Sequence, residues 1–112
     1  MSKPPEGFLG QFEQMTLLSV LQLDNRAYGV ELRKHLEAQT GRAVSHGALY
    51  VTLDRLEAKG LVASESSPAP AQRGGRPRRY VSVTPAGTRA LADARRAMLT
   101  LWQGVEEVLD RS

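Results

Sequence analysis

The sequence contains no cysteine and only two histidines among its 112 residues. The absence of cysteine excludes disulfide bridges, thiolate zinc sites and cysteine nucleophiles together. The two histidines, His35 and His46, show no metal-ligand spacing, and no glycine-rich phosphate loop follows a candidate strand. Asp54 and Glu57 have the spacing of a solvated helix face rather than of a catalytic pair. We therefore predict a protein that is not an enzyme and that carries no metal or cofactor.

A long hydrophobic run is also missing, because crossing a bilayer takes about 18–20 apolar residues. The densest apolar stretch, Met15–Leu23, is interrupted by Thr16, Ser19 and Gln22. The first residues, Met1–Gly7, have no apolar segment after their single lysine and so do not form a secretory signal. We therefore expect a cytoplasmic protein without a membrane partner.

A chain of this length, with 41% hydrophobic and 24% charged residues, has the composition of one small globular domain. The formal charge of +3 is a small excess, but no acidic residue accompanies the four arginines that occur between Gln72 and Arg79. These arginines are a candidate contact for a polyanion: Arg73, Arg76, Arg78 and Arg79. A solvated loop whose arginines only aid solubility is the alternative for such a cluster taken alone.

The first half of the chain predicts three helices after a loose arm at residues 1–8. The apolar segment Leu9–Leu23 predicts a helix that is buried on most sides. A second helix is expected over Tyr28–Gln39, from an apolar repeat of four residues. The third helix, His46–Lys59, follows Ser45, whose hydroxyl is typical of an N-cap.

The segment after the third helix predicts a basic β-hairpin. Leu61–Ser66 and Tyr80–Val83 are candidate strands. Residues 67–79, between them, contain three prolines, two adjacent glycines and the four clustered arginines. Three helices and a hairpin follow the order of a winged helix-turn-helix. We therefore expect a mainly α fold with a small β-hairpin wing (α+β), with the winged domain over residues 9–84.

A final helix is predicted from the N-cap Thr84 and the first-turn residue Pro85 to about Asp110. Such a helix would be about 35–40 Å long, and its apolar stripe is more than a domain of this size can cover. Residues 85–112 are therefore predicted to form a dimerisation helix, which makes a homodimer the expected assembly. The expected dimer contacts are Leu91, Met98, Leu101, Trp102, Val105, Val108 and Leu109.

Three segments of the sequence resemble the PadR family of bacterial transcriptional regulators, in its short form. Ser45–Val62 (SHGALYVTLDRLEAKGLV) resembles the recognition helix of the family. Arg73–Gly87 (RGGRPRRYVSVTPAG) resembles its wing strand and the start of its last helix, and Tyr28–Leu32 (YGVEL) the opening of its second helix. Val51 departs from the pattern, because the family often has proline after the Leu-Tyr pair.

The resemblance implies a sequence-specific DNA-binding regulator, most simply a dimeric repressor on an inverted-repeat operator. At 100° per residue, the third helix buries its leucines and turns small or apolar residues outward near its N-terminus. The expected DNA-binding residues are Tyr28, Ser45, His46, Gly47, Ala48, Tyr50, Val51, Arg55, Arg73, Arg76, Arg78 and Arg79. Some of these have structural alternatives: packing relief for Gly47, support of the wing for Tyr50, and the edge of the core for Tyr28.

Trp102, in the predicted last helix, is the candidate ligand contact. The resemblance implies a ligand role for Trp102, because some short PadR regulators stack flat aromatic drugs on a tryptophan of the dimer interface. A small planar aromatic effector is therefore a candidate partner, and a purely structural role for Trp102 is the alternative.

The competing function is a winged-helix protein–protein adaptor without DNA binding, which the clustered arginines disfavour.

Overall fold

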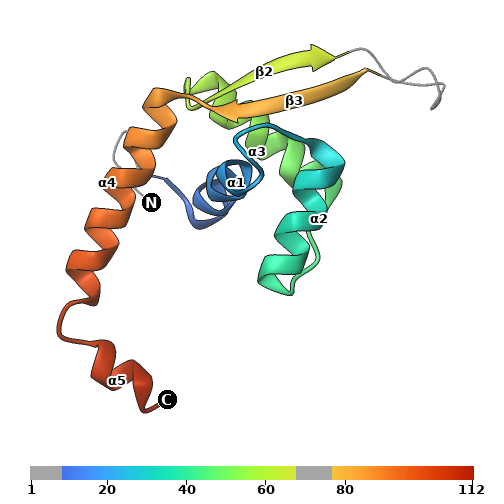
Figure 1. Cartoon of the computed structure of the whole chain (residues 1–112). Helices are drawn as coiled ribbons and strands as arrows, with labels where there is room; N and C mark the ends of the chain where they lie inside the picture. Colours follow the sequence, from blue (N-terminus) through green and yellow to red (C-terminus); the bar gives the residue numbers. More distant parts are fainter. Residues whose placement is uncertain (1–8, 68–76) are drawn as a thin grey trace, which may run out of the picture.

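The computed structural model describes residues 9–67 and 77–112 (Figure 1). Its elements are α1 (Gln11–Gln22), β1 (Ala27–Tyr28), α2 (Gly29–Thr40), α3 (His46–Ala58), β2 (Val62–Ser67), β3 (Arg78–Val83), α4 (Pro85–Trp102) and α5 (Glu106–Asp110). The first three helices and the sheet form one body, from which α4 and α5 extend (Figure 1). The prediction of a mainly α fold with a small β-hairpin wing is confirmed. The predicted arm, and the part of the wing that contains Arg73 and Arg76, lie outside the described residues.

The core lies between the three N-terminal helices and the inner face of the sheet. α3 contributes Leu49, Leu53 and Leu56, which are the leucines that the sequence placed on its buried side. Each fully buried side chain of this size contributes about 1.5–3 kcal/mol to folding. The other large, fully buried hydrophobic side chains are Leu17, Val20, Leu32, Leu36 and Val81.

One side of α1 is open, so the prediction of a helix buried on most sides is only partly correct. Leu17 and Val20 face the core, whereas Leu18 and Leu21 are exposed. The reason is that α4 leans away from the body instead of lying along α1 (Figure 1). An apolar face of α1 therefore remains uncovered within this chain.

The sheet has a third strand that sequence reasoning missed. Its order is β1-β3-β2, with both pairs antiparallel and with Tyr28 opposite Tyr80. The side-chain amide of Asn25 continues the pairing, since its Oδ1 accepts from the Val83 amide at 2.7 Å and its Nδ2 donates to the Val83 carbonyl at 3.3 Å. Asn25 itself has a left-handed backbone (φ 56°). This turn ties the base of the wing to the junction between α1 and α2.

α4 starts as predicted, because the Thr84 hydroxyl accepts from the Gly87 amide at 3.1 Å and Pro85 occupies the first turn. A Cβ at Gly87 would lie 2.2 Å from the Leu61 carbonyl oxygen, so only glycine fits where α4 leaves the body. The predicted continuous helix to Asp110 is wrong. Gly104 has a left-handed backbone (φ 84°), which ends α4 and starts the separate α5.

A partly buried ion pair links the start of α1 to the end of α3. Glu13 accepts from the Gly10 amide and from Lys59 Nζ, each at 2.9 Å. Burial raises the pKa of the Glu13 carboxyl, but these hydrogen bonds outweigh the burial, and the pKa lies below its usual value. Because the folded-state pKa is depressed, the contribution is present above the unfolded pKa and is lost as the pH falls through the folded pKa.

We therefore expect Glu13→Gln to lower the free energy of unfolding by about 1–3 kcal/mol at neutral pH. Urea unfolding at a series of pH values should show this difference shrinking as the pH falls below the unfolded value of 4.5. A difference between wild type and variant that stays constant from pH 7 to pH 3 would contradict this account.

Candidate nucleic-acid interface

α3 presents its outer side to solvent from its first turn onward. The Ala48 amide donates to Ser45 Oγ at 3.1 Å, which confirms Ser45 as the N-cap. Val51 is 57% exposed, and a Cβ on Gly47 would meet open space. Gly47 therefore does not relieve packing within the described part of the chain, and the outer side of α3 can approach another molecule closely. His46, Gly47 and Ala48 are all exposed there.

Tyr50 joins the first half of α3 to the start of α2. Its hydroxyl lies 2.0 Å from the position that a Cβ on Gly29 would occupy, so the ring rests directly on the backbone of α2. The ring of His46 lies beside it, tilted by 40°, with 4.3 Å between centroids. Gly29 is a residue that sequence reasoning missed. Gly29 stands in the YGVEL motif, but its role depends on Tyr50, which lies far away in the sequence and packs on it only in the folded chain.

Arg78 lies on the outer face of the sheet, close to the start of α2. Its guanidinium carbon is 4.4 Å from the centroid of the Tyr28 ring, and Tyr28 meets Tyr80 edge to face at 5.7 Å. A hydrogen bond with Tyr80 is the largest cause of a raised pKa for Arg78 and of a lowered pKa for Tyr80. Tyr28 thus belongs to the sheet and at the same time holds a cationic side chain in place.

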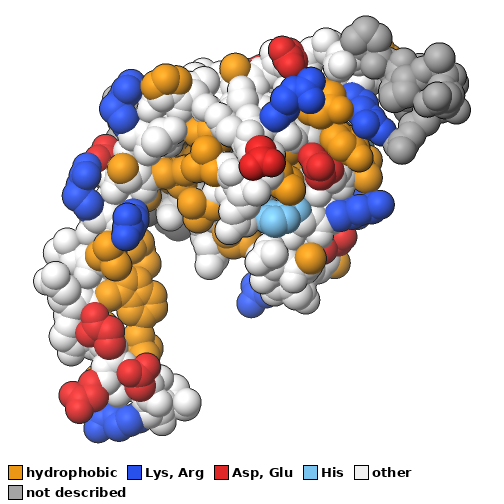
Figure 2. All heavy atoms as spheres, viewed as in Figure 1, with side chains coloured by type: hydrophobic (Ala, Val, Ile, Leu, Met, Phe, Trp, Pro, Cys, Tyr) orange, Lys and Arg blue, Asp and Glu red, His pale blue; other side chains and the backbone are white. Residues whose placement is uncertain are grey.

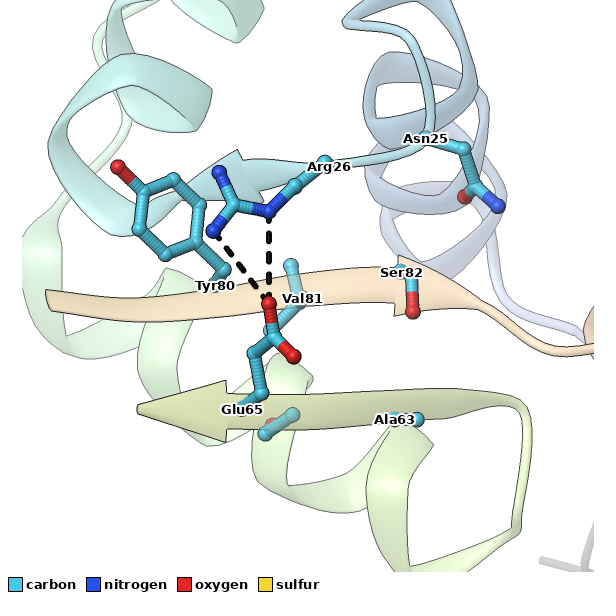
Figure 3. Close-up of a pocket in the computed structure, with 8 residues that line it drawn as sticks. Asn25, Arg26, Ala63, Glu65, Tyr80, Val81 and Ser82 are labelled. Atoms are coloured by element: carbon cyan, nitrogen blue, oxygen red, sulfur yellow. Dashed lines mark hydrogen bonds and ion pairs between the residues drawn. The ribbon is translucent and has the colours of Figure 1, made fainter. Parts of the chain in front are cut away.

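A second arginine packs on the same face. Arg26 lies 3.7 Å above the centroid of the Tyr80 ring and pairs with Glu65 at 3.4 Å (Figure 3). Sequence reasoning missed Arg26, because its position depends on the register that sets Glu65 opposite Tyr80. One row of neighbouring side chains therefore crosses the strands, in the order Arg78, Tyr28, Tyr80 and Arg26.

Arg79 points to the other face of the sheet, toward α3. Its guanidinium donates to Asp54 Oδ1 at 3.0 Å and to Glu57 Oε2 at 3.1 Å. Asp54 and Glu57 therefore do not form the merely solvated face that their spacing predicted. Arg55 is exposed, and its charge helps to lower the pKa of Glu13, which places it on the side of α3 that faces α1.

Contacts thus connect several of the predicted residues into one surface. His46 touches Tyr50, Tyr50 rests on Gly29 at the start of α2, and the adjacent Tyr28 lies under Arg78. We call the exposed outer side of α3 together with these residues the α3–wing surface. It combines a helix that another molecule can approach with an arginine held beside it. Arg73 and Arg76 lie outside the described residues.

An apolar groove between α1 and α4 is the second feature of the surface. Figure 2 shows hydrophobic side chains along the side of α4 that faces the body. The groove has a volume of about 440 Å³ and is lined chiefly by Leu18, Leu21, Leu91, Met98, Leu99 and Trp102. Of the predicted dimer contacts, Leu91, Met98 and Trp102 line it. The others are exposed outside it: Leu101, Val105, Val108 and Leu109.

The described ranges contain neither a membrane-spanning helix nor a cluster of metal ligands. None of the helices there is both long enough and apolar enough to span a bilayer. Within residues 9–67 and 77–112, no three histidine, aspartate or glutamate side chains gather in a way that could hold a metal ion.

A sequence profile of the PadR-like family of transcriptional regulators matches residues 17–93, which is more than half of the chain. The chain belongs to this PadR-like family. The matched residues include α2, α3, the hairpin strands and the first half of α4. Its members are transcriptional regulators, and such proteins are generally not enzymes.

Individual relatives agree with this assignment. The chain is 45% identical over 75 residues to transcriptional regulator Rv3488 of Mycobacterium tuberculosis, in a match that covers 67% of this chain and 65% of that protein. The structure of a PadR family regulator from Eggerthella lenta DSM 2243 superposes with a TM-score of 0.68 at 31% identity, covering 88% of this chain and 84% of the other.

The fold also resembles that of a protein with much lower sequence identity. F93 from STIV, described as a winged-helix DNA-binding protein, matches with a TM-score of 0.69 at 15% identity and covers 87% of this chain and 97% of F93. At that identity the likeness concerns the fold alone. Together the comparisons confirm the family and the fold that the sequence predicted.

Proposed function

We propose that this PadR-like regulator binds duplex DNA through the α3–wing surface. In this proposal the outer side of α3 enters the major groove while the wing contacts the neighbouring backbone. The observation that carries it is the placement of Arg78, which is held on Tyr28 next to the start of α2, beside an α3 whose outer side is exposed. A cationic side chain next to a solvent-exposed helix is complementary to duplex DNA, which has a negatively charged backbone and a groove that admits a helix.

The residues of this surface suggest different roles in such a complex. The first amides of α3, at His46 and Gly47, can donate to a phosphate, because Ser45 caps only the amide of Ala48. Val51 offers an apolar contact to a thymine methyl group. Arg73 and Arg76 remain part of the proposal as further phosphate or minor-groove contacts. Arg55 remains a candidate for guanine readout toward the α1 side of α3.

The contribution of Arg78 can be measured by the salt dependence of binding. We expect Arg78→Ala to weaken binding to every duplex and to reduce the slope of log K against log [salt] by about one. Fluorescence anisotropy with a labelled 24-base-pair duplex of random sequence, at several salt concentrations, gives the slope.

Arg89→Ala is the matched control, since it removes the same charge from an exposed position on α4. An unchanged slope in Arg78→Ala would count against the wing contact. A wild-type protein that binds no duplex at all would instead favour the protein–protein adaptor.

The dimer belongs to the same proposal. Residues 9–84 would bind DNA and residues 85–112, together with the open face of α1, would pair two copies. The apolar groove supports this, because exposed side chains such as Leu18, Leu99 and Trp102 gather there. A two-fold dimer would place two α3 helices roughly 34–36 Å apart, so the operator would be an inverted repeat and its occupation would repress transcription.

A small planar aromatic effector is the proposed regulator of this dimer. Trp102 lines the groove and is 42% exposed, so a flat ring can stack on it. Because Trp102 is the single tryptophan of the chain, its fluorescence reports on this place alone. We expect quenching by planar cationic dyes such as ethidium in the absence of DNA. Fluorescence that no member of such a panel changes would contradict the effector role.

Two expectations, the lack of a catalytic group or cofactor and the cytoplasmic location, depend on DNA binding. A regulator of this kind needs no catalytic group or cofactor, because it acts by occupying DNA. Its expected cytoplasmic location follows from the location of its proposed target, since promoter DNA lies inside the cell.

A further inference from the structure

Arg79 uses all three of its guanidinium nitrogens within the chain. Nη1 donates to Asp54 and Nη2 to Glu57, both on α3, and Nε donates to Ser64 on β2 at 3.0 Å. Its side chain is only 28% exposed, although it lies in the most basic segment of the sequence. Arg79 therefore connects three elements: β3, which carries it, together with β2 and α3.

Arg78 and Arg79 are neighbours in the sequence but differ in their surroundings. Side chains alternate along a strand, so Arg78 is on the outer face and Arg79 on the face toward α3. Among the described residues, no carboxylate lies within ion-pair distance of Arg78, whereas Arg79 has two such partners. A phosphate would have to compete with these two carboxylates for the charge of Arg79. Its placement is that of a brace between wing and helix.

We propose that Arg79 is a positioning residue that holds the wing against α3, so that both engage the duplex as one body. This inference rests on the proposed DNA-binding function, and it removes Arg79 from the expected DNA contacts. Arg79 also offsets part of the negative charge of Asp54 and Glu57, which repels the phosphates beside α3.

The planar guanidinium is essential to this role. Its nitrogens diverge in one plane and can serve three acceptors on two elements at once. A lysine ammonium is a point charge that suits a single phosphate but cannot span the same three partners. Replacing arginine by lysine therefore separates the two roles, since a phosphate contact tolerates the change and a brace does not.

The first test compares Arg79→Lys with Arg89→Lys on the labelled 24-base-pair duplex. We expect Arg79→Lys to weaken binding about tenfold with an unchanged salt slope, and Arg89→Lys to bind within about twofold of wild type. Arg89→Lys is the matched control, because it makes the same exchange at an exposed position on α4, outside the α3–wing surface. Binding of Arg79→Lys within twofold of wild type would overturn the proposal.

The second test removes the partners instead of the arginine. Asp54→Ala with Glu57→Ala frees Arg79 and takes away two negative charges near the DNA. If Arg79 were a phosphate contact, this double variant would bind DNA more tightly and with a steeper salt slope. If Arg79 holds the wing, the double variant removes its two partners on α3. We therefore expect weaker DNA binding despite the more favourable charge. Tighter binding would overturn the proposal.

The third test needs no DNA. Hydrogen exchange of the amides in β3 should be faster in Arg79→Lys and in the double variant than in wild type, and unchanged in Arg89→Lys. Circular dichroism confirms that each variant is folded. Unchanged exchange in Arg79→Lys would overturn the brace. Should the wild type bind no duplex, the proposed function fails, while the exchange measurement still decides whether Arg79 holds the wing.

Discussion

Replacing Leu99 by glutamate is expected to convert the proposed dimer into a monomer and to weaken operator binding by about 100-fold or more. Leu99 lines the groove between α1 and α4 and is 50% exposed in the single chain, so the change leaves the core of the subunit intact. A carboxylate placed in an apolar contact loses its hydration without gaining a partner, which disfavours association. The loss of affinity follows because two linked half-site contacts become one.

Light scattering during size exclusion gives the mass of the Leu99→Glu variant, and anisotropy with an operator duplex selected from a random pool gives its affinity. Ala97→Glu is the matched control. It introduces the same charge two residues away, at an exposed position that does not line the groove. A Leu99→Glu variant that remains dimeric would exclude the groove as the interface. Equal losses of DNA affinity in both variants would show that the added negative charge weakens binding, and not the loss of an apolar contact in the groove.

The second large effect is a difference in stability between substitutions on the buried side and on the exposed side of α3. We expect Leu53→Ala to lower the free energy of unfolding by about 2–5 kcal/mol, because Leu53 is only 1% exposed and its truncation leaves a cavity among the core leucines. Val51→Ala, two positions earlier on the same helix, should change stability by less than about 0.5 kcal/mol. Urea unfolding followed by circular dichroism measures both changes.

DNA binding should show the opposite order. Val51→Ala should weaken binding to the selected operator while leaving binding to a random duplex nearly unchanged, because only sequence-specific contacts involve the thymine methyl. Leu53→Ala should retain both affinities under conditions in which it is folded. If Val51→Ala proved as destabilising as Leu53→Ala, the outer side of α3 would belong to a core and could not read DNA.

The sequence predicted well those features that depend on neighbouring residues. The N-cap Ser45, the start of α4 at Thr84 and Pro85, and the buried side of α3 all follow from spacings of a few residues. Hydrogen bonds of a helix end and the turn of a helix are local, so the side chains that control them stand close together in the chain. The order of the first three helices and the two hairpin strands, and the family motifs, follow from the same local signals.

Other features could not be predicted, because they join distant parts of the chain. Asn25 pairs with Val83 across 58 positions, and the pairing of Arg79 with Asp54 depends on how the hairpin lies over α3. The break at Gly104 was missed because the apolar stripe runs on beyond it and a glycine within a helical pattern is often tolerated.

The sequence by itself determined the class of protein, the order of its first three helices and the two hairpin strands, and the cationic character of its wing. These depend on residue types and short spacings. Only the tertiary structure decided which wing arginine faces outward, since strand alternation places Arg78 and Arg79 on opposite sides but does not say which side meets α3. The packing of the sheet on α3 makes that choice, and it gives two adjacent arginines different surroundings.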